Sequence, residues 1–169
     1  MLKNQMQKNT LYSIRVYKQY FNFASSHFML FNDGTREPLH GHNYRVQVKG
    51  NAMDLNNDMV FDFLNIKPIV RTICNKLDHK LLLPENNSFL KIKADNKNYI
   101  LTTMDESIFS IPQSDILILP IENTSAERLA YYLAHEIKTL VWEQFHFKFV
   151  ELEVEVEETP GQSAIVILT

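Results

Sequence analysis

Three histidines are the first candidates for chemistry in this 169-residue chain: His27, His40 and His42. Side chains at positions i and i+2 of a strand point to the same face, so His40 and His42 can face one pocket. His27 ends the preceding strand-like stretch, and a loop that returns the chain to His40 would bring the three rings together. Three neutral imidazoles with a fourth position left open are the usual ligands of a catalytic zinc ion. The plainer interpretation is three unrelated histidines, because an H-x-H pair alone is a weak signal.

A second candidate is a carboxylate that stands where an apolar residue is expected. Residues 150–157 alternate between apolar residues and glutamates, which predicts a strand with one buried and one solvated face. Glu158 breaks the alternation, because it falls on the apolar face, where a carboxylate is costly without a partner. Paired N–H donors of a ligand would be such a partner. Alternatively, the strand frays at residues 159–160 and Glu158 reaches water.

Asp78 and His79 are adjacent to each other directly after a predicted helix, and an acid beside a histidine can move a proton. The structural alternative is that the helix dipole stabilises a histidine near a helix C-terminus. Cys74, the single cysteine, falls on the apolar stripe of that helix. A buried free cysteine behaves as a small hydrophobic residue, so we do not expect Cys74 to be catalytic.

Composition limits the class of protein. A hydrophobic content of 45% over 169 residues is typical of one globular domain with a substantial core, which we place at residues 11–169. The net charge of −3 and the lack of a Lys/Arg cluster argue against a nucleic-acid partner. No apolar run is long enough for a membrane span, and the polar residues 1–10 resemble a loose tail rather than a secretory signal. One cysteine fits a reducing cytoplasm, where we expect the protein to reside.

The elements that must position these residues follow the order ββααββ. The predicted helices are residues 66–77, with an apolar stripe at helical spacing, and residues 125–142, preceded by a capping-box pattern. The predicted strands cover residues 11–23, 43–48, 148–158 and 164–168. Residues 84–120 form an insertion between the helices, to which we assign no function. It contains a predicted hairpin of residues 89–93 and 98–103 and a further strand at 116–119.

Several motifs in this order resemble the 6-pyruvoyltetrahydropterin synthase and 6-carboxytetrahydropterin synthase family. The matching stretches read FNFASSH at 21–27, HGHNY at 40–44, VFDF at 60–63, LDHK at 77–80, NTSAE at 123–127 and VEET at 156–159. The resemblance extends from about residue 17 to residue 166, which is nearly the whole chain. It implies the α+β tunnelling fold, an antiparallel sheet with two helices on one face. The barrel is completed by oligomerisation, with trimers stacked into a hexamer and active sites at subunit interfaces.

The resemblance also implies roles for individual residues. The substrate would be a small molecule, 7,8-dihydroneopterin triphosphate, with Zn²⁺ as the cofactor. His27, His40 and His42 match the zinc ligands, and Asp78 and His79 match a proton-relay pair. Glu158 matches the carboxylate that anchors the pterin ring, and Thr124 and Ser125 match a loop that contacts the pterin.

One departure from the family pattern concerns the catalytic base. Most members carry a cysteine shortly before the H-G-H motif, and residues 31–39 contain none. Glu37, three residues before His40, is the expected substitute, and the subset of the family with glutamate here is implied to cleave the side chain to 6-hydroxymethyl-7,8-dihydropterin. Otherwise Glu37 is an ordinary loop charge, paired with Arg36.

Other functions remain open at this point. The product could be 6-carboxytetrahydropterin, for the queuosine pathway, or 6-pyruvoyltetrahydropterin. The protein could also bind zinc and pterin without catalysis, although the presence of Asp78, His79 and Glu158 argues against such a loss.

Overall fold

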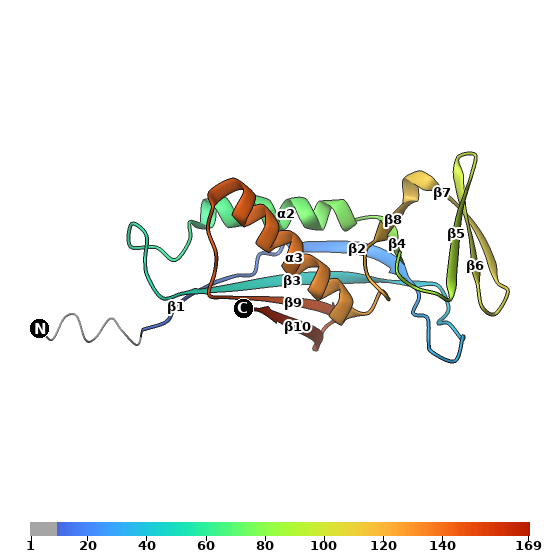
Figure 1. Ribbon diagram of the computed structural model, residues 1–169, viewed down its shortest axis with the longest axis horizontal. Coiled ribbons are helices and arrows are strands. Elements are labelled where there is room, and N and C mark those ends of the chain that lie inside the picture. Colours follow the sequence, from blue (N-terminus) through green and yellow to red (C-terminus); the bar gives the residue numbers. More distant parts are fainter. Residues whose placement is uncertain (1–9) are drawn as a thin grey trace, which may run out of the picture.

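The computed structural model describes residues 10–169, so the predicted tail at residues 1–10 lies outside the described residues except for Thr10. Two helices lie along one face of a long, twisted sheet, and a smaller sheet stands at one end of it (Figure 1). This is an α+β arrangement, as the sequence predicts. Within residues 10–169, no helix is both long and apolar enough to cross a membrane.

The main sheet is organised around one long strand, β3 (His40–Ala52). The hydrogen-bonded order is β10-β9-β3-β2-β4-β8, and β1 also pairs with β3. The other strands are β1 (Tyr12–Val16), β2 (Asn22–His27), β4 (Lys80–Pro84), β8 (Ile116–Leu119), β9 (Glu151–Thr159) and β10 (Gln162–Leu168).

Two details differ from the sequence prediction. The stretch 11–23 is not one strand, because β1 pairs with the C-terminal half of β3 while β2 pairs with its N-terminal half. The sheet is also mixed rather than wholly antiparallel, because β2–β4 and β4–β8 are parallel pairs. The first difference arises from the length of β3, which leaves room for two strands in succession along it.

The alternation in β9 has the predicted consequence. Leu152, Val154 and Val156 are buried under the helices, while the neighbouring glutamates remain partly exposed on the other face. There Glu157 and Glu153 form ion pairs of 3.8 and 3.6 Å with Arg45 and Lys49 of β3. Such exposed pairs contribute little to stability. The burial of one face therefore determines the register of β9.

Both helices begin at capping residues. Helix α2 (Phe63–Leu77) starts three residues earlier than predicted, because the Asp62 side chain accepts a hydrogen bond from the Leu64 amide. Helix α3 (Ala126–Phe145) starts after Ser125, whose hydroxyl oxygen accepts from the Arg128 amide at 3.3 Å. The predicted capping box has Thr124 as its first residue and Glu127 as its last, so the observed cap lies one residue later, and the Thr124 hydroxyl donates to the Phe28 carbonyl instead. Their apolar faces pack on the sheet and form one core with Phe23, Tyr44 and the inward side chains of β9.

The insertion between the helices forms a second, three-stranded antiparallel sheet. It consists of β5 (Leu90–Asp95), β6 (Asn98–Thr103) and β7 (Ile108–Pro112), followed by a 3₁₀ turn, η2 (Gln113–Asp115). The predicted hairpin is confirmed, whereas its third strand was not expected from the sequence. The small sheet packs on residues that include Phe28 and Leu81, which follow or lie within strands of the main sheet. It therefore lies near the end of the main sheet that carries His27 and His40 (Figure 1).

Candidate metal centre and active site

The ends of two paired strands bring the three histidines together. His27 ends β2 and lies directly opposite His40, the first residue of β3, and His42 follows on the same face of β3. The potential ligand atoms of the three rings all lie within 4.8 Å of one another. The geometry that the sequence spacing predicted for these residues is therefore present.

The surroundings of His27 fit a metal ligand. Its Nδ1 lies 2.9 Å from the carbonyl oxygen of Thr124, and a carbonyl can only accept, so Nδ1 carries the proton. Its Nε2 is buried and has no hydrogen-bond partner. An orphaned, buried imidazole nitrogen with a free lone pair is what a metal ion requires. Burial, followed by the nearby His40, lowers the pKa of His27, so the ring is neutral at physiological pH.

His40 is oriented in the same way. Its Nδ1 lies 2.8 Å from the carbonyl oxygen of Pro38, which leaves Nε2 free to face His27 and His42. Three imidazole nitrogens without a thiolate are typical ligands of catalytic zinc, and imidazole also suits other transition metals. The three residues thus fit a divalent transition metal, with zinc as the expected ion.

Glu158 points into the same site. Its Oε1 atom lies 3.6 Å from Nε2 of His27 and 3.5 Å from Nε2 of His42. The hydroxyl group of buried Tyr44 donates to this oxygen at 3.3 Å. Burial and then the Glu158 charge raise the pKa of Tyr44, so the phenol keeps its proton and remains a donor. The structure therefore places Glu158 on the face of Val154 and Val156, and its contact with a pterin stays a prediction.

Glu37 lines the same cavity as the three histidines and Glu158, a space of about 380 Å³. Its amide donates to the Met29 carbonyl at 2.9 Å, and its carboxylate accepts from the Met29 amide at 3.2 Å. The alternative of an ion pair with Arg36 is wrong, since the Arg36 guanidinium forms its ion pair with Asp105, at 3.2 Å. These two hydrogen bonds hold Glu37 beside the candidate metal centre.

Thr124 and Ser125 have different surroundings. Thr124 is fully buried, and its hydroxyl donates to the Phe28 carbonyl at 3.1 Å, so its side chain lies behind His27 and does not line the cavity. Ser125 does line it. Sequence reasoning missed that Thr124 orients His27, and it also missed Asn123, whose side chain exchanges two hydrogen bonds with the Leu30 backbone at 2.7 and 3.2 Å. The only sequence signal was the NTSAE motif itself.

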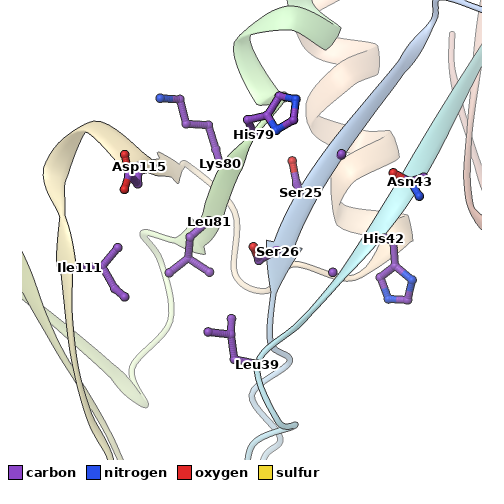
Figure 2. Close-up of a pocket in the computed structure, with 12 residues that line it drawn as sticks. Ser25, Ser26, Leu39, His42, Asn43, His79, Lys80, Leu81, Ile111 and Asp115 are labelled. Atoms are coloured by element: carbon purple, nitrogen blue, oxygen red, sulfur yellow. The ribbon is translucent and has the colours of Figure 1, made fainter.

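His79 lines a second cavity, of about 550 Å³, which His42 also lines (Figure 2). Asp78 accepts from the Ala24 amide at 2.7 Å and lies 3.6 Å from Nε2 of His79. The His79 ring is largely exposed and, in Figure 2, points away from the His42 ring. Asn43 and Gly41, which alternate with the metal-facing histidines along β3, also line this second cavity. Neither Asp78 nor His79 lines the cavity that all three histidines share, and His42 is the histidine that lines both cavities.

Cys74 is fully buried in α2, and burial raises the pKa of its thiol to about 12. The thiol is therefore protonated at physiological pH and lies in the core, away from the site. It provides no substitute for the cysteine that is absent from residues 31–39.

The fold and the site together define a tunnelling-fold protein with a three-histidine centre and a nearby carboxylate. The chain belongs to the 6-pyruvoyl tetrahydropterin synthase family, whose model matches residues 15–167. A relative from Methanocaldococcus jannaschii, provisionally named 6-carboxy-5,6,7,8-tetrahydropterin synthase, is 37% identical over 145 residues, which are 84% of this chain and 86% of the relative. The 6-carboxy-5,6,7,8-tetrahydropterin synthase of Haemophilus influenzae is 27% identical over 124 residues, which are 70% of this chain and 78% of the H. influenzae protein.

Solved structures support the same family. The 6-pyruvoyltetrahydropterin synthase of Plasmodium vivax superposes on this structure with a TM-score of 0.88 and 32% sequence identity. The match covers 95% of this chain and 99% of the P. vivax chain. The Plasmodium falciparum enzyme gives the same TM-score at 33% identity and the same coverage. The P. vivax enzyme has also been solved as variants in which a catalytic glutamate is replaced by alanine or by cysteine.

Proposed function

We propose that this protein is a zinc-dependent lyase that acts on 7,8-dihydroneopterin triphosphate and cleaves its side chain to 6-hydroxymethyl-7,8-dihydropterin. The observation that carries this proposal is the Glu37 carboxylate, which lines the cavity of His27, His40 and His42 while the single cysteine lies in the core. When bound, zinc would supply a Lewis acid for the oxygens of the substrate side chain.

Two carboxylates of the chain would bind the substrate and move a proton. Glu158 would accept the paired N–H groups of the pterin ring, a strong and directional contact for a carboxylate. Glu37 would remove a proton from a side-chain hydroxyl as general base. When the hydroxyl farther from the ring loses its proton, its oxygen forms a carbonyl as the bond between the two hydroxyl carbons breaks. The electron pair of that bond passes to the carbon attached to the pterin, which takes up a proton, and the triphosphate-bearing fragment leaves as an aldehyde. Elimination of triphosphate instead needs proton removal from carbon, a harder task for which most family members use a cysteine.

The P. vivax enzyme supports a catalytic glutamate in this family, because its described variants replace a catalytic glutamate by alanine or cysteine. The names of the curated relatives favour a second candidate, 6-carboxytetrahydropterin synthase. A third, a zinc- and pterin-binding protein without catalysis, would bind the substrate and leave it unchanged.

Product analysis tests the proposal and separates the candidates. Zinc-loaded protein is incubated with 7,8-dihydroneopterin triphosphate, and the products are identified by mass spectrometry. We expect 6-hydroxymethyl-7,8-dihydropterin as the main product. A 6-carboxy product would move the assignment to the second candidate, and unchanged substrate to the third.

Glu37→Gln tests the base. We expect kcat to fall by roughly 10²–10⁴-fold with unchanged zinc content, as is typical for the loss of a general base. Glu37→Cys restores a thiol at this position and should shift part of the product toward triphosphate elimination. Near-normal turnover of Glu37→Gln would remove Glu37 from the mechanism.

We further propose that the protein assembles as a trimer-based hexamer and that Asp78 and His79 complete the active site of a neighbouring subunit. Neither residue lines the cavity that all three histidines share, although His79 lines the neighbouring cavity with His42, and this placement supports the arrangement. No nucleic-acid or membrane partner is part of this proposal, and the cytoplasmic location stays a prediction from the sequence.

A further inference from the structure

The side chain of Arg36 joins the inserted small sheet to the loop that carries Glu37. Its Nε atom lies 3.2 Å from Oδ2 of Asp105, and its terminal nitrogen donates to the Ser107 hydroxyl at 3.0 Å. The guanidinium carbon lies 5.0 Å from the ring centroid of Phe109, a distance typical of a cation–π contact. All three partners belong to the turn between β6 and β7 or to β7 itself. The insertion thus contacts the guanidinium on several sides.

The same guanidinium reaches the backbone of the candidate base. Its other terminal nitrogen donates to the carbonyl oxygen of Glu37 at 3.0 Å. The amide and carboxylate of Glu37 are both bound to Met29, two residues after the metal-facing His27. Glu37 is therefore held from two directions, by the continuation of β2 through Met29 and by the insertion through Arg36.

The groups that hold Arg36 are themselves fixed. The Phe109 ring stacks on Phe28, the neighbour of His27, at 5.6 Å between centroids and 15° between planes. Asp105 accepts hydrogen bonds from the Thr103 hydroxyl and the Ser107 amide. These bonds, the Thr103 hydroxyl first, lower the pKa of Asp105 and keep it anionic at neutral pH. Arg36 consequently has a preorganised anionic partner.

We propose that Arg36 is a positioning residue, and that the β6–β7 turn acts through it to place the Glu37 carboxylate relative to the three histidines. The insertion is then part of the catalytic apparatus, although no hydrogen bond or ion pair joins its described side chains to Glu37 directly. The role in catalysis rests on the proposed function of Glu37, whereas the mechanical link between the turn and the Glu37 loop does not.

Asp105→Asn is the most selective test of this link. Asparagine keeps an oxygen that can accept from Thr103 and Ser107 but presents a neutral group to Arg36. The matched control is Glu106→Gln, which removes one negative charge from an exposed residue of the same turn. Hydrogen exchange of residues 28–39 is the readout that needs no substrate. We expect faster exchange there in Asp105→Asn and wild-type exchange in Glu106→Gln.

The kinetic readout uses the zinc-loaded protein and 7,8-dihydroneopterin triphosphate. We expect kcat of Asp105→Asn to fall by roughly 10-fold with unchanged KM and zinc content, because a small displacement of a catalytic group is costly. Arg36→Lys, which loses the planar fork of donors, should behave similarly. In a Glu37→Gln background, Asp105→Asn should cause no further loss of kcat, since the two residues would act as one unit.

The outcomes separate the two proposals. Unchanged exchange in Asp105→Asn would overturn the mechanical link. Faster exchange with unchanged kcat in Asp105→Asn would overturn the positioning role and leave Arg36 as a structural residue. So would a loss of kcat in Asp105→Asn that adds fully to the loss in Glu37→Gln. A wild-type protein that yields no product, with exchange still faster in Asp105→Asn, would instead overturn the proposed function and leave the link established.

Discussion

At the scale of single residues, hydrogen bonds behind the site determine what its side chains can do. Carbonyl oxygens of Thr124 and Pro38 bind the Nδ1 atoms of His27 and His40, so the Nε2 lone pairs face the centre of the cluster. Tyr44 acts on Glu158 in a comparable way, since its hydroxyl donates to one carboxylate oxygen. These hydrogen bonds fix the orientation of the side chains, which is a condition for strong electrostatic interactions with a ligand.

The proposed pterin contact of Glu158 gives a prediction at this scale. Glu158→Gln keeps the shape of the side chain but replaces an acceptor oxygen by a donor, which would face the N–H groups of the pterin. We expect a loss of about 2–4 kcal/mol in substrate binding, because buried donors lose their partner and the charge assistance disappears. Calorimetric titration with a pterin would measure it.

Glu157→Gln is the matched control, since Glu157 lies on the opposite face of β9 beside Arg45. It should bind the pterin almost as the wild type does. Equal losses in the two variants would show that the apolar-face position of Glu158 has no special role.

At the scale of elements, the long strand β3 is the main organiser. Its first residues carry two of the three histidines, its middle pairs with β9, and its end pairs with β1. The alternation of apolar residues predicts that such strands exist. It does not specify which strand lies beside which, and this is why β1 and β2 were expected as one strand.

Gly50 provides a test of this strand. A Cβ atom at Gly50 would lie 2.4 Å from a carbon of the Phe149 ring, closer than packed atoms can approach. We therefore expect Gly50→Ala to lower the free energy of unfolding by about 1–3 kcal/mol, the usual cost of overpacking. Urea or thermal unfolding of the metal-free protein would measure it.

A smaller residue at position 149 should restore part of this loss. Because Gly50 and Phe149 are in contact, the effects of Gly50→Ala and Phe149→Leu should not add in the double variant. Simple additivity of the two losses would show that the ring is not what opposes the extra methyl group.

At the scale of the whole molecule, the open sheet edges are the dominant feature. Strand β10 ends the order of the main sheet, and within residues 10–169 its outer edge pairs with no other strand. Its Ile165 and Ile167 are 53% and 55% exposed. Unpaired edges with apolar side chains promote aggregation unless another chain covers them.

We therefore expect the protein to form a trimer-based oligomer, most simply a hexamer, in which neighbouring subunits pair these edges. Multi-angle light scattering on the purified protein at micromolar concentration would give the mass directly. The measurement should be made with and without zinc. Pairing of strand edges uses backbone hydrogen bonds and should not require the metal, so we expect the same mass under both conditions. A monomer under both conditions would contradict the prediction.

The sequence by itself determined much of this protein. The spacing of His40 and His42 predicted their shared face, the alternation before Glu158 predicted its inward position, and the capping residues located α3. These features are local, because strand and helix periodicity and end caps depend on residues a few positions apart. Together with the order of the motifs, they were sufficient to indicate the family and the fold.

Only the tertiary structure decided which distant groups meet. Thr124 lies behind His27 across 97 positions of the chain, and Arg36 meets Ser107 across 71. The separation of Asp78 and His79 from the cavity of the three histidines likewise depends on how β2 and β4 pair. Such contacts follow from which strands pair and from the packing of a whole core, and a short-range pattern in the sequence specifies neither.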